Sequence, residues 1–453
     1  MQRLLDRRLL ELLDLALCVV ERDYDLPAFR ARAFDAEAAA GIITALAGRL
    51  HEDYPYFHPL YAGQMLKPPH PIARLAYIVG MSINPNNHAL DGGRASSMME
   101  KEAVGELMGM FGWQNGLGHL TSGGTMANLE ALWVAGRQHP GKKIVSSSQA
   151  HYTHQRISAV LGLHCESIAC DNRARMDMDA LRAVLERGGV GTVVATIGTT
   201  ATGSVDPLAE ILRLRDEFGF RLHVDAAYGG YFGLVSELCA QTRAAYASMG
   251  SADSIVIDPH KHGLQPYGCG CVLFRDASVG ALYKHDSPYT YFSSNDLHLG
   301  EISLECSRAG ASAVALWATQ QLLPLEIDGA FAESLRDGHR AALQLYARLR
   351  TDDRFITFFE PQLDIVVWGI RAPTVSQASQ RARDIFAAAE RRGLYLALVE
   401  LPLQLAAQHF EGIASDRATI TCLRSVLMKP EHLDWIDRIV ELLEVATSDV
   451  LDR

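Results

Sequence analysis

Cysteine is scarce in this sequence, long apolar runs are absent, and basic residues do not cluster. The 453 residues include 8 cysteines and no CxxC pair, so we expect neither a disulfide framework nor a metal site. Lysine and arginine never cluster beyond pairs such as Arg391 and Arg392, and the net charge is −11, which argues against a nucleic-acid partner. No apolar run is long enough to span a bilayer, so the sequence predicts a cytoplasmic protein without membrane contact.

The composition predicts a large globular protein with a buried core. Hydrophobic residues make up 48% of the chain and charged residues 21%, which is ordinary for globular domains. Residues 1–100 look helical and irregular, and their charged, leucine-rich opening is typical of an amphipathic helix rather than a signal peptide. Residues 101–325 form the expected large α/β domain, and residues 326–453 a smaller α+β domain.

Strand and helix patterns alternate through the expected large domain. Short, apolar strand patterns occur at residues 142–148, 190–200, 220–230 and 253–258. Helical patterns occur at residues 125–138, 179–189 and 206–219. Apolar strands that alternate with helices indicate a mostly parallel sheet with both faces covered.

Polar segments are expected at the carboxyl ends of these strands, where open α/β sheets bind ligands. The loop TSGGT at 121–125 opens directly into a helix, so its backbone N–H groups and the helix dipole can bind a phosphate. Asp225 ends an apolar strand, and a buried carboxylate requires a cationic partner. Lys261 follows another strand, where burial can lower the pKa of a lysine enough for imine formation. His151 is expected at the same edge.

A single ligand requires all of these parts. Pyridoxal 5'-phosphate needs a phosphate cradle, an acid beside its pyridine nitrogen, a lysine that forms a Schiff base and a flat group against its ring. The small residues Ala226 and Ala227 leave room for such a ring. Pyridoxal 5'-phosphate is therefore the cofactor that we predict.

Several segments resemble, in order, the signatures of the group II pyridoxal-phosphate-dependent amino-acid decarboxylases. That family includes glutamate, aromatic-amino-acid, archaeal tyrosine and diaminobutyrate decarboxylases. The resemblance implies fold type I, the architecture of aspartate aminotransferase, with an N-terminal helical segment, a mostly parallel sheet in the large domain and a small C-terminal α+β domain. The segments are TSGGTMANLEAL, AHYTH, GTTATGSVDP, HVDAAYGG, DPHK and SRAGASAVALW.

The resemblance implies a role for each matching residue at the ring of the cofactor. Lys261 matches the lysine that forms the Schiff base, and Asp225 matches the acid that pairs with the pyridine nitrogen. His151 matches the imidazole stacked on one face of the ring, and Ala227 the small residue packed against the ring. Thr200 matches a hydroxyl near the cofactor's ring oxygen or the acid.

The phosphate contacts implied by the resemblance include one discordant position. Gly124 and Thr125 match the phosphate loop, and His260 matches the histidine that helps to hold the phosphate. Several relatives have asparagine where this chain has Asp258, and an acid beside a phosphate is repelled unless it turns away or pairs with a cation. Asp258 is therefore not assigned to the cofactor, and the role of Arg308 stays open between the site and the fold.

The resemblance implies decarboxylation of an L-amino acid to its amine and carbon dioxide through Lys261. The carbanion would be protonated from a loop after the lysine, residues 285–300, where Tyr291 is the preferred donor and Tyr289 the alternative. Both tyrosines could instead pack on a neighbouring subunit. Relatives are homodimers with active sites at the subunit interface, so a homodimer is expected. The amino acid, whether aromatic, acidic or basic, stays open.

Other reactions remain as alternatives on the same fold and cofactor. Sphingosine-phosphate lyases share similar segments but cleave between Cα and Cβ, and aldehyde synthases divert the carbanion to oxygen. An aminotransferase is disfavoured, because an aromatic residue usually stacks there where this chain has His151. A non-catalytic scaffold is disfavoured because both Lys261 and Asp225 are present.

Overall fold

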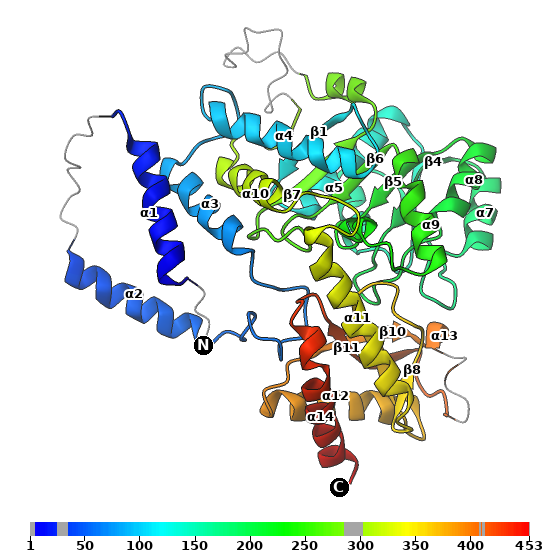
Figure 1. The fold of residues 1–453 in the computed structure, drawn as a ribbon. Coiled ribbons are helices and arrows are strands. Elements are labelled where there is room, and N and C mark those ends of the chain that lie inside the picture. The colour runs from blue at the N-terminus through cyan, green and yellow to red at the C-terminus, as the bar shows by residue number, and fades with distance from the viewer. Residues whose placement is uncertain (1–4, 25–34, 285–301, 407–408, 410–412, 453) are drawn as a thin grey trace.

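The computed structural model describes residues 5–24, 35–284, 302–406, 409 and 413–452. Within these residues a large α/β body carries a smaller sheet below it, and a pair of helices lies to one side (Figure 1). None of the helices in the described ranges combines the length and the hydrophobicity that a bilayer span requires.

The larger sheet has seven strands in the described part of the chain, in the order β1-β7-β6-β5-β4-β2-β3. β7 is antiparallel to both of its neighbours, β1 and β6, and the other described pairs are parallel. The expected mostly parallel sheet of fold type I is therefore confirmed. The strands are β1 (Leu117–Thr121), β2 (Lys143–Ser147), β3 (Cys165–Ile168), β4 (Val190–Thr196), β5 (Arg221–Asp225), β6 (Ser254–Ile257) and β7 (Gly270–Phe274).

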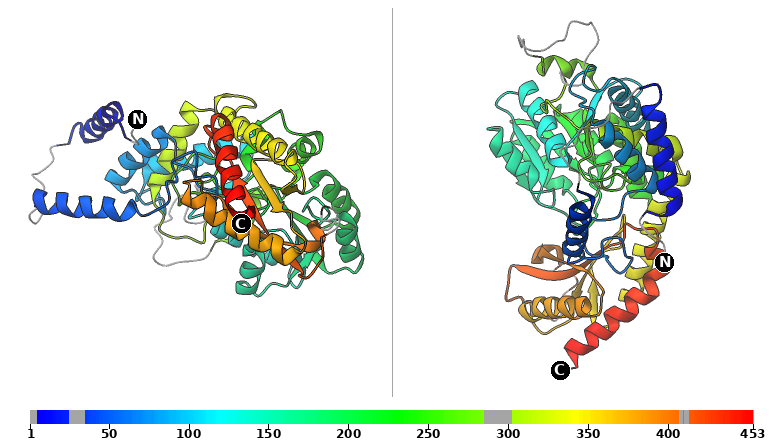
Figure 2. Two further views of the ribbon diagram at one scale, coloured as in Figure 1. Left: turned by 90° about the horizontal axis from the view of Figure 1, so that it is seen from below. Right: turned by 90° about the vertical axis from the view of Figure 1, so that its left-hand side faces the viewer.

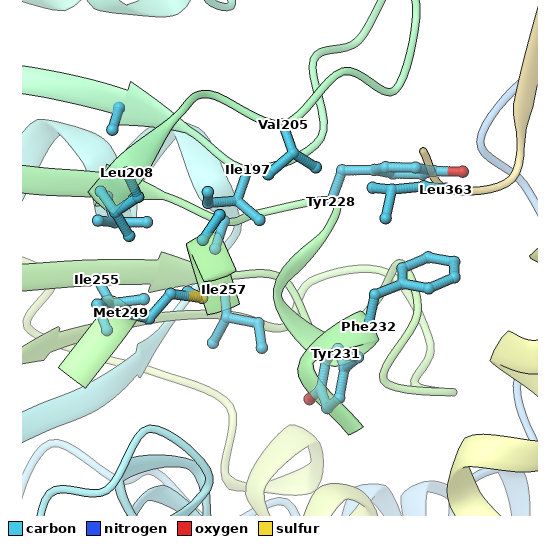
Figure 3. Packing of buried hydrophobic residues seen from close by; sticks show 14 of the residues in the cluster. Ile197, Val205, Leu208, Tyr228, Tyr231, Phe232, Met249, Ile255, Ile257 and Leu363 are labelled. Carbon is cyan, nitrogen blue, oxygen red and sulfur yellow. The ribbon is translucent and has the colours of Figure 1, made fainter. Parts of the chain in front are cut away.

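Both faces of the larger sheet are buried, which explains the apolar runs in its strands. Alternate residues of a strand point to opposite faces. Ile255 and Ile257 belong to one core cluster, which includes Leu208 and Met249 (Figure 3). Val256, between them, packs on the opposite face against the helix formed by Gly124–Gln138. The helices that flank this sheet are α5 (Gly124–Gln138), α6 (Thr153–Val160), α7 (Met178–Glu186), α8 (Leu208–Phe218) and α9 (Ala240–Ser248).

The smaller sheet is antiparallel, in the order β10-β11-β9-β8, and two views show it below the larger body (Figures 1 and 2). Its own core centres on Trp368, which is fully buried with Ile385 and Ile439 from the covering helices. Its strands are β8 (Phe355–Thr357), β9 (Ile365–Ile370), β10 (Ala397–Pro402) and β11 (Thr419–Val426). Its helices are α11 (Ala330–Arg350), α12 (Val375–Arg391), α13 (Leu403–Ala406) and α14 (His432–Leu451).

The N-terminal helices differ in how they contact the body. Helices α3 (Pro71–Ile83) and α4 (Arg94–Met110) pack against α10 (Gly310–Leu322) and contribute buried residues. Helices α1 (Arg7–Glu21) and α2 (Ala36–Leu50) contribute none, and both figures show α2 standing away from the body (Figures 1 and 2).

Candidate active site

A cavity of about 320 Å³ opens at the carboxyl ends of β4, β5 and β6, beside the N-terminus of α5. Its volume is in the range of small-molecule sites. Tyr291 lies outside the described residues. The structure places all the residues predicted to bind the cofactor around this cavity: Gly124, Thr125, His151, Thr200, Asp225, Ala227, His260 and Lys261.

Asp225 ends β5 with its side chain almost fully buried. Its Oδ2 accepts a hydrogen bond of 2.8 Å from Nε2 of His154, and its Oδ1 accepts one of 3.1 Å from the backbone N–H of Ala227. Burial acts to raise the pKa of Asp225, but the hydrogen bond and charge of His154, with Lys261 and His223, hold that pKa below its ordinary value. The carboxyl is therefore an anion at neutral pH.

Lys261 lies in the tight turn between β6 and β7. Its Nζ is 3.1 Å from Oδ2 of Asp258, and its backbone N–H donates to the carbonyl of Asp258. A Cβ added to Gly263 would lie 2.5 Å from Cα of Pro259, so only glycine allows the chain to reverse this closely. The turn holds a partly exposed amine at the end of the sheet.

The loop before α5, which is predicted to bind the phosphate, contains glycines where a side chain would fill the space. Gly123, just before α5, has a φ of +155°, and no side chain caps the helix. A Cβ added to Gly124 would lie 2.5 Å from Oδ2 of Asp258. The first backbone N–H groups of α5 therefore stay available to an anion.

His260 and Asp258 lie beside this loop. The backbone N–H of Cys269 donates to Nδ1 of His260, and burial lowers the pKa of His260, so the neutral ring carries its proton on Nε2. Asp258 is 2% exposed, and its Oδ1 has no hydrogen-bond partner among the described residues. Oδ2 of Asp258 instead lies 3.1 Å from Nζ of Lys261.

His151 lies before α6 at the rim of the cavity. Burial lowers its pKa, so the ring is neutral at pH 7. The backbone N–H of Thr153 donates to its Nδ1, which leaves the proton on Nε2. A neutral, planar ring at this position fits a flat aromatic ligand.

Two polar residues that contact Asp225, Asn128 and His154, were not predicted from the sequence. Asn128 donates from Nδ2 to the carbonyl of Gly124, at 2.9 Å, and to Oδ2 of Asp225, at 3.4 Å. Its Oδ1 faces Nε2 of His223 at 2.8 Å. His154 gave one signal, since it follows His151 by three residues and could share a helix face with it; Asn128, inside a helical pattern, gave none.

The smaller sheet reaches the cavity through two contacts. Arg424 on β11 donates from its guanidinium to the carbonyl of Thr200 at 2.9 Å. Tyr228, which lines the cavity, donates to Oδ1 of Asp364 at 2.6 Å. Arg308 is not among the residues that line the cavity; its guanidinium contacts Glu100 at 2.7 Å, which indicates a structural role.

The residues around the cavity fit pyridoxal phosphate. An anion at Asp225 suits a protonated pyridine nitrogen, and the amine of Lys261 suits an aldehyde. The glycine cradle and the Nε2–H of His260 suit a phosphate. The donor set thus has a partner for each part of the cofactor.

Comparison with known proteins agrees with this geometry. Residues 50–371 match the family model described as the pyridoxal-dependent decarboxylase conserved domain. A probable L-tyrosine/L-aspartate decarboxylase of Methanothermobacter thermautotrophicus is 29% identical over 71% of this chain and 86% of that protein. An L-tyrosine decarboxylase of Enterococcus faecalis is 27% identical over 56% of this chain and 57% of that protein, so the chain spans little more than half of the latter.

The fold comparison gives the same class. The crystal structure of Oryza sativa TDC with PLP and tryptamine superposes with a TM-score of 0.78 over 99% of both chains, at 18% identity. At that identity the likeness shows the fold alone, which is fold type I. The chain belongs to the pyridoxal-dependent decarboxylase family, and it is a pyridoxal-phosphate-dependent amino-acid decarboxylase.

Proposed function

We propose that this chain converts L-tyrosine to its amine and carbon dioxide, with Lys261 as the residue that binds the cofactor. The observation that carries the proposal is the shared cavity of Lys261 and ionised Asp225 at the N-terminus of α5. Both of the reported curated relatives have L-tyrosine in their names. L-Aspartate is the second candidate, because the methanogen protein is named for both amino acids.

The protein's own groups would divide the work of binding and orientation. Bound pyridoxal phosphate supplies an acceptor for the electrons released at the substrate Cα. Asp225 would hold a proton at the ring nitrogen, and His151 would pack its neutral ring on the cofactor. The N–H groups at Gly124 and Thr125 would bind the phosphate together with His260.

The choice of bond depends on how the protein orients the substrate. Only the bond held perpendicular to the conjugated ring breaks readily, so decarboxylation requires the carboxylate in that position. Arg424, which donates to the carbonyl of Thr200, would keep the Thr200 side of the cavity in place. Tyr291 stays our candidate for the proton donor to Cα, and it lies outside the described residues.

A homodimer is part of the proposal. Large apolar side chains on α1 and α2 are exposed, among them Leu15 at 61%, Ile42 at 68% and Ile43 at 62%. Isolated apolar residues on a surface are ordinary, but neither helix has a buried residue on any face. A second copy that covers these helices would bury them. The cytoplasmic location expected from the sequence stays a prediction.

Carbon dioxide release from a panel of L-amino acids tests the reaction. We expect release from L-tyrosine with equimolar amine, and none from Lys261→Ala. An aldehyde formed with oxygen consumption would favour the aldehyde-synthase alternative. Cleavage of a phosphorylated amino alcohol to an aldehyde, without carbon dioxide from any amino acid, would favour the lyase alternative and contradict the proposal.

A further inference from the structure

His154 lies behind the cavity rather than on its wall. It is fully buried on the first turn of α6, and it is not among the residues that line the cavity. Its Nε2 is 2.8 Å from Oδ2 of Asp225, while its Nδ1 has no hydrogen-bond partner among the described residues. The polar contact of the His154 ring is therefore directed at Asp225.

The hydrogen bonds around His223 fix which ring nitrogen of that residue carries the proton. Since Asn128 donates from Nδ2 to the carbonyl of Gly124, its Oδ1 faces His223 and accepts from Nε2–H of that ring. Burial lowers the pKa of His223 to about 3, so that ring stays neutral, and its Nδ1 accepts from the hydroxyl of Ser254. His223 thus has no hydrogen bond to give to Asp225.

His154 is then the strongest of the side-chain donors to Asp225. The other donor, Asn128, is 3.4 Å from Oδ2, near the outer limit of a hydrogen bond. Hydrogen bonds to charged groups are stronger than neutral ones and shorten accordingly, as the 2.8 Å contact does.

The titratable groups that face Asp225 come from each neighbouring element. They are His154 on α6, His151 before that helix, His223 on β5 and Lys261 after β6. The rings of His151 and His223 are neutral at pH 7, and the amine of Lys261 is paired with Asp258. Of these four groups, His154 is the one that hydrogen-bonds to Asp225.

We propose that His154 is a positioning residue for the decarboxylase: its Nε2–H fixes Oδ2 of Asp225 and keeps that carboxyl ionised and directed into the cofactor cavity. The inference rests on the proposed function, because it requires the cofactor's ring nitrogen beside Asp225. It goes beyond that function by assigning a role to a residue that does not line the cavity.

Two polar substitutions of His154 separate the hydrogen bond that it donates to Asp225 from the packing of its ring. The amide nitrogen in His154→Gln reaches about as far as Nε2 of histidine, whereas His154→Asn is one methylene shorter and leaves Oδ2 without this donor. Ser158→Ala, a buried substitution one turn later on α6, controls for disturbance of the helix. Cofactor affinity, measured by titration of the apoenzyme with pyridoxal phosphate between about pH 5 and about pH 9, is the readout that does not depend on turnover.

The expected result is a split between the two substitutions. His154→Asn should weaken cofactor binding about tenfold and add a further loss of affinity toward acid pH. The Asp225 carboxyl takes up a proton more readily when it lacks this hydrogen bond. His154→Gln and Ser158→Ala should stay within about twofold of the unaltered protein, with the same pH profile.

Equal effects of the two substitutions, or none from either, would overturn the assignment of His154. The unaltered protein is measured first, so the two proposals can be told apart. If it does not bind pyridoxal phosphate at all, the proposed function fails and this inference with it. If it binds and His154→Asn loses no more affinity toward acid pH than the unaltered protein does, only the inference fails.

Discussion

Asp225 is the residue whose charge the proposed chemistry needs most. Asp225→Asn keeps the shape of the side chain but can no longer hold a proton at the ring nitrogen of the cofactor. We expect turnover to fall about a hundredfold or more, while cofactor binding stays measurable. Carbon dioxide release and cofactor titration on the same preparation check this, and turnover within a few-fold of the unaltered enzyme would contradict it.

Substitution of Gly124 tests whether the loop before α5 binds the phosphate. The Cβ introduced by Gly124→Ala would lie 2.5 Å from Oδ2 of Asp258, so the loop or the acid must shift. We expect cofactor affinity to fall about tenfold. Gly109→Ala, in α4, is the matched control because an added Cβ there meets nothing within 4 Å. Equal affinities of the two variants would show that the loop does not hold the phosphate.

Individual site residues differ in how far the sequence could predict them. Lys261 and Asp225 could be predicted because Asp225 ends one buried strand and Lys261 lies in the turn after another, and parallel strands end at one edge. Asn128 and His154 could not, since their contacts depend on how α5 and α6 dock on the sheet. The contact between Asp258 and Lys261 could not be predicted either, because it depends on the folded turn. The sequence predicted only that Asp258 must turn away from a phosphate or pair with a cation.

At the scale of elements, the strand patterns predicted at residues 142–148, 190–200, 220–230 and 253–258 correspond to β2, β4, β5 and β6, whereas β3 was not predicted. β4 and β5 are buried on both faces and leave a continuous apolar signal. β3 is four residues long and mostly half-exposed, so its sequence resembles a loop. β7 runs antiparallel to β6, and residues 258–269, which include Lys261, connect the two strands.

Helix α2 tests the proposed dimer. Ile43→Glu combined with Leu46→Glu would place charges among its exposed apolar side chains, where a second copy is expected to pack. We expect the dimer to dissociate at micromolar concentration. Thr44→Glu combined with Glu37→Gln alters the opposite face of α2 without a change in net charge and should leave the dimer intact. Analytical ultracentrifugation measures both, and a monomer in the unaltered protein would contradict the proposal.

At the scale of the whole molecule, buried histidines predict a loss of stability in acid. Burial lowers the pKa of His223 and of His432 from 6.5 to about 3. As the pH falls below about 6.5, the unfolded chain takes up protons there that the folded protein does not, so the free energy of unfolding falls. Asp206 opposes this, since burial raises its pKa to about 6, but it is one group against two.

Urea unfolding of the apoenzyme at about pH 7 and about pH 5 measures this dependence. The free energy of unfolding should be lower at the acid pH, and His432→Gln should reduce the difference. Stability that is unchanged or higher in acid would contradict it.

The identity of the amine that binds the cofactor is the central claim about the molecule. Borohydride reduction of the protein loaded with pyridoxal phosphate, followed by peptide mass mapping, locates that amine directly. We predict a single stable adduct on Lys261, with loss of the visible absorbance band, and no adduct in Lys261→Arg. An adduct on another lysine, or none in protein that retains the cofactor, would contradict the account.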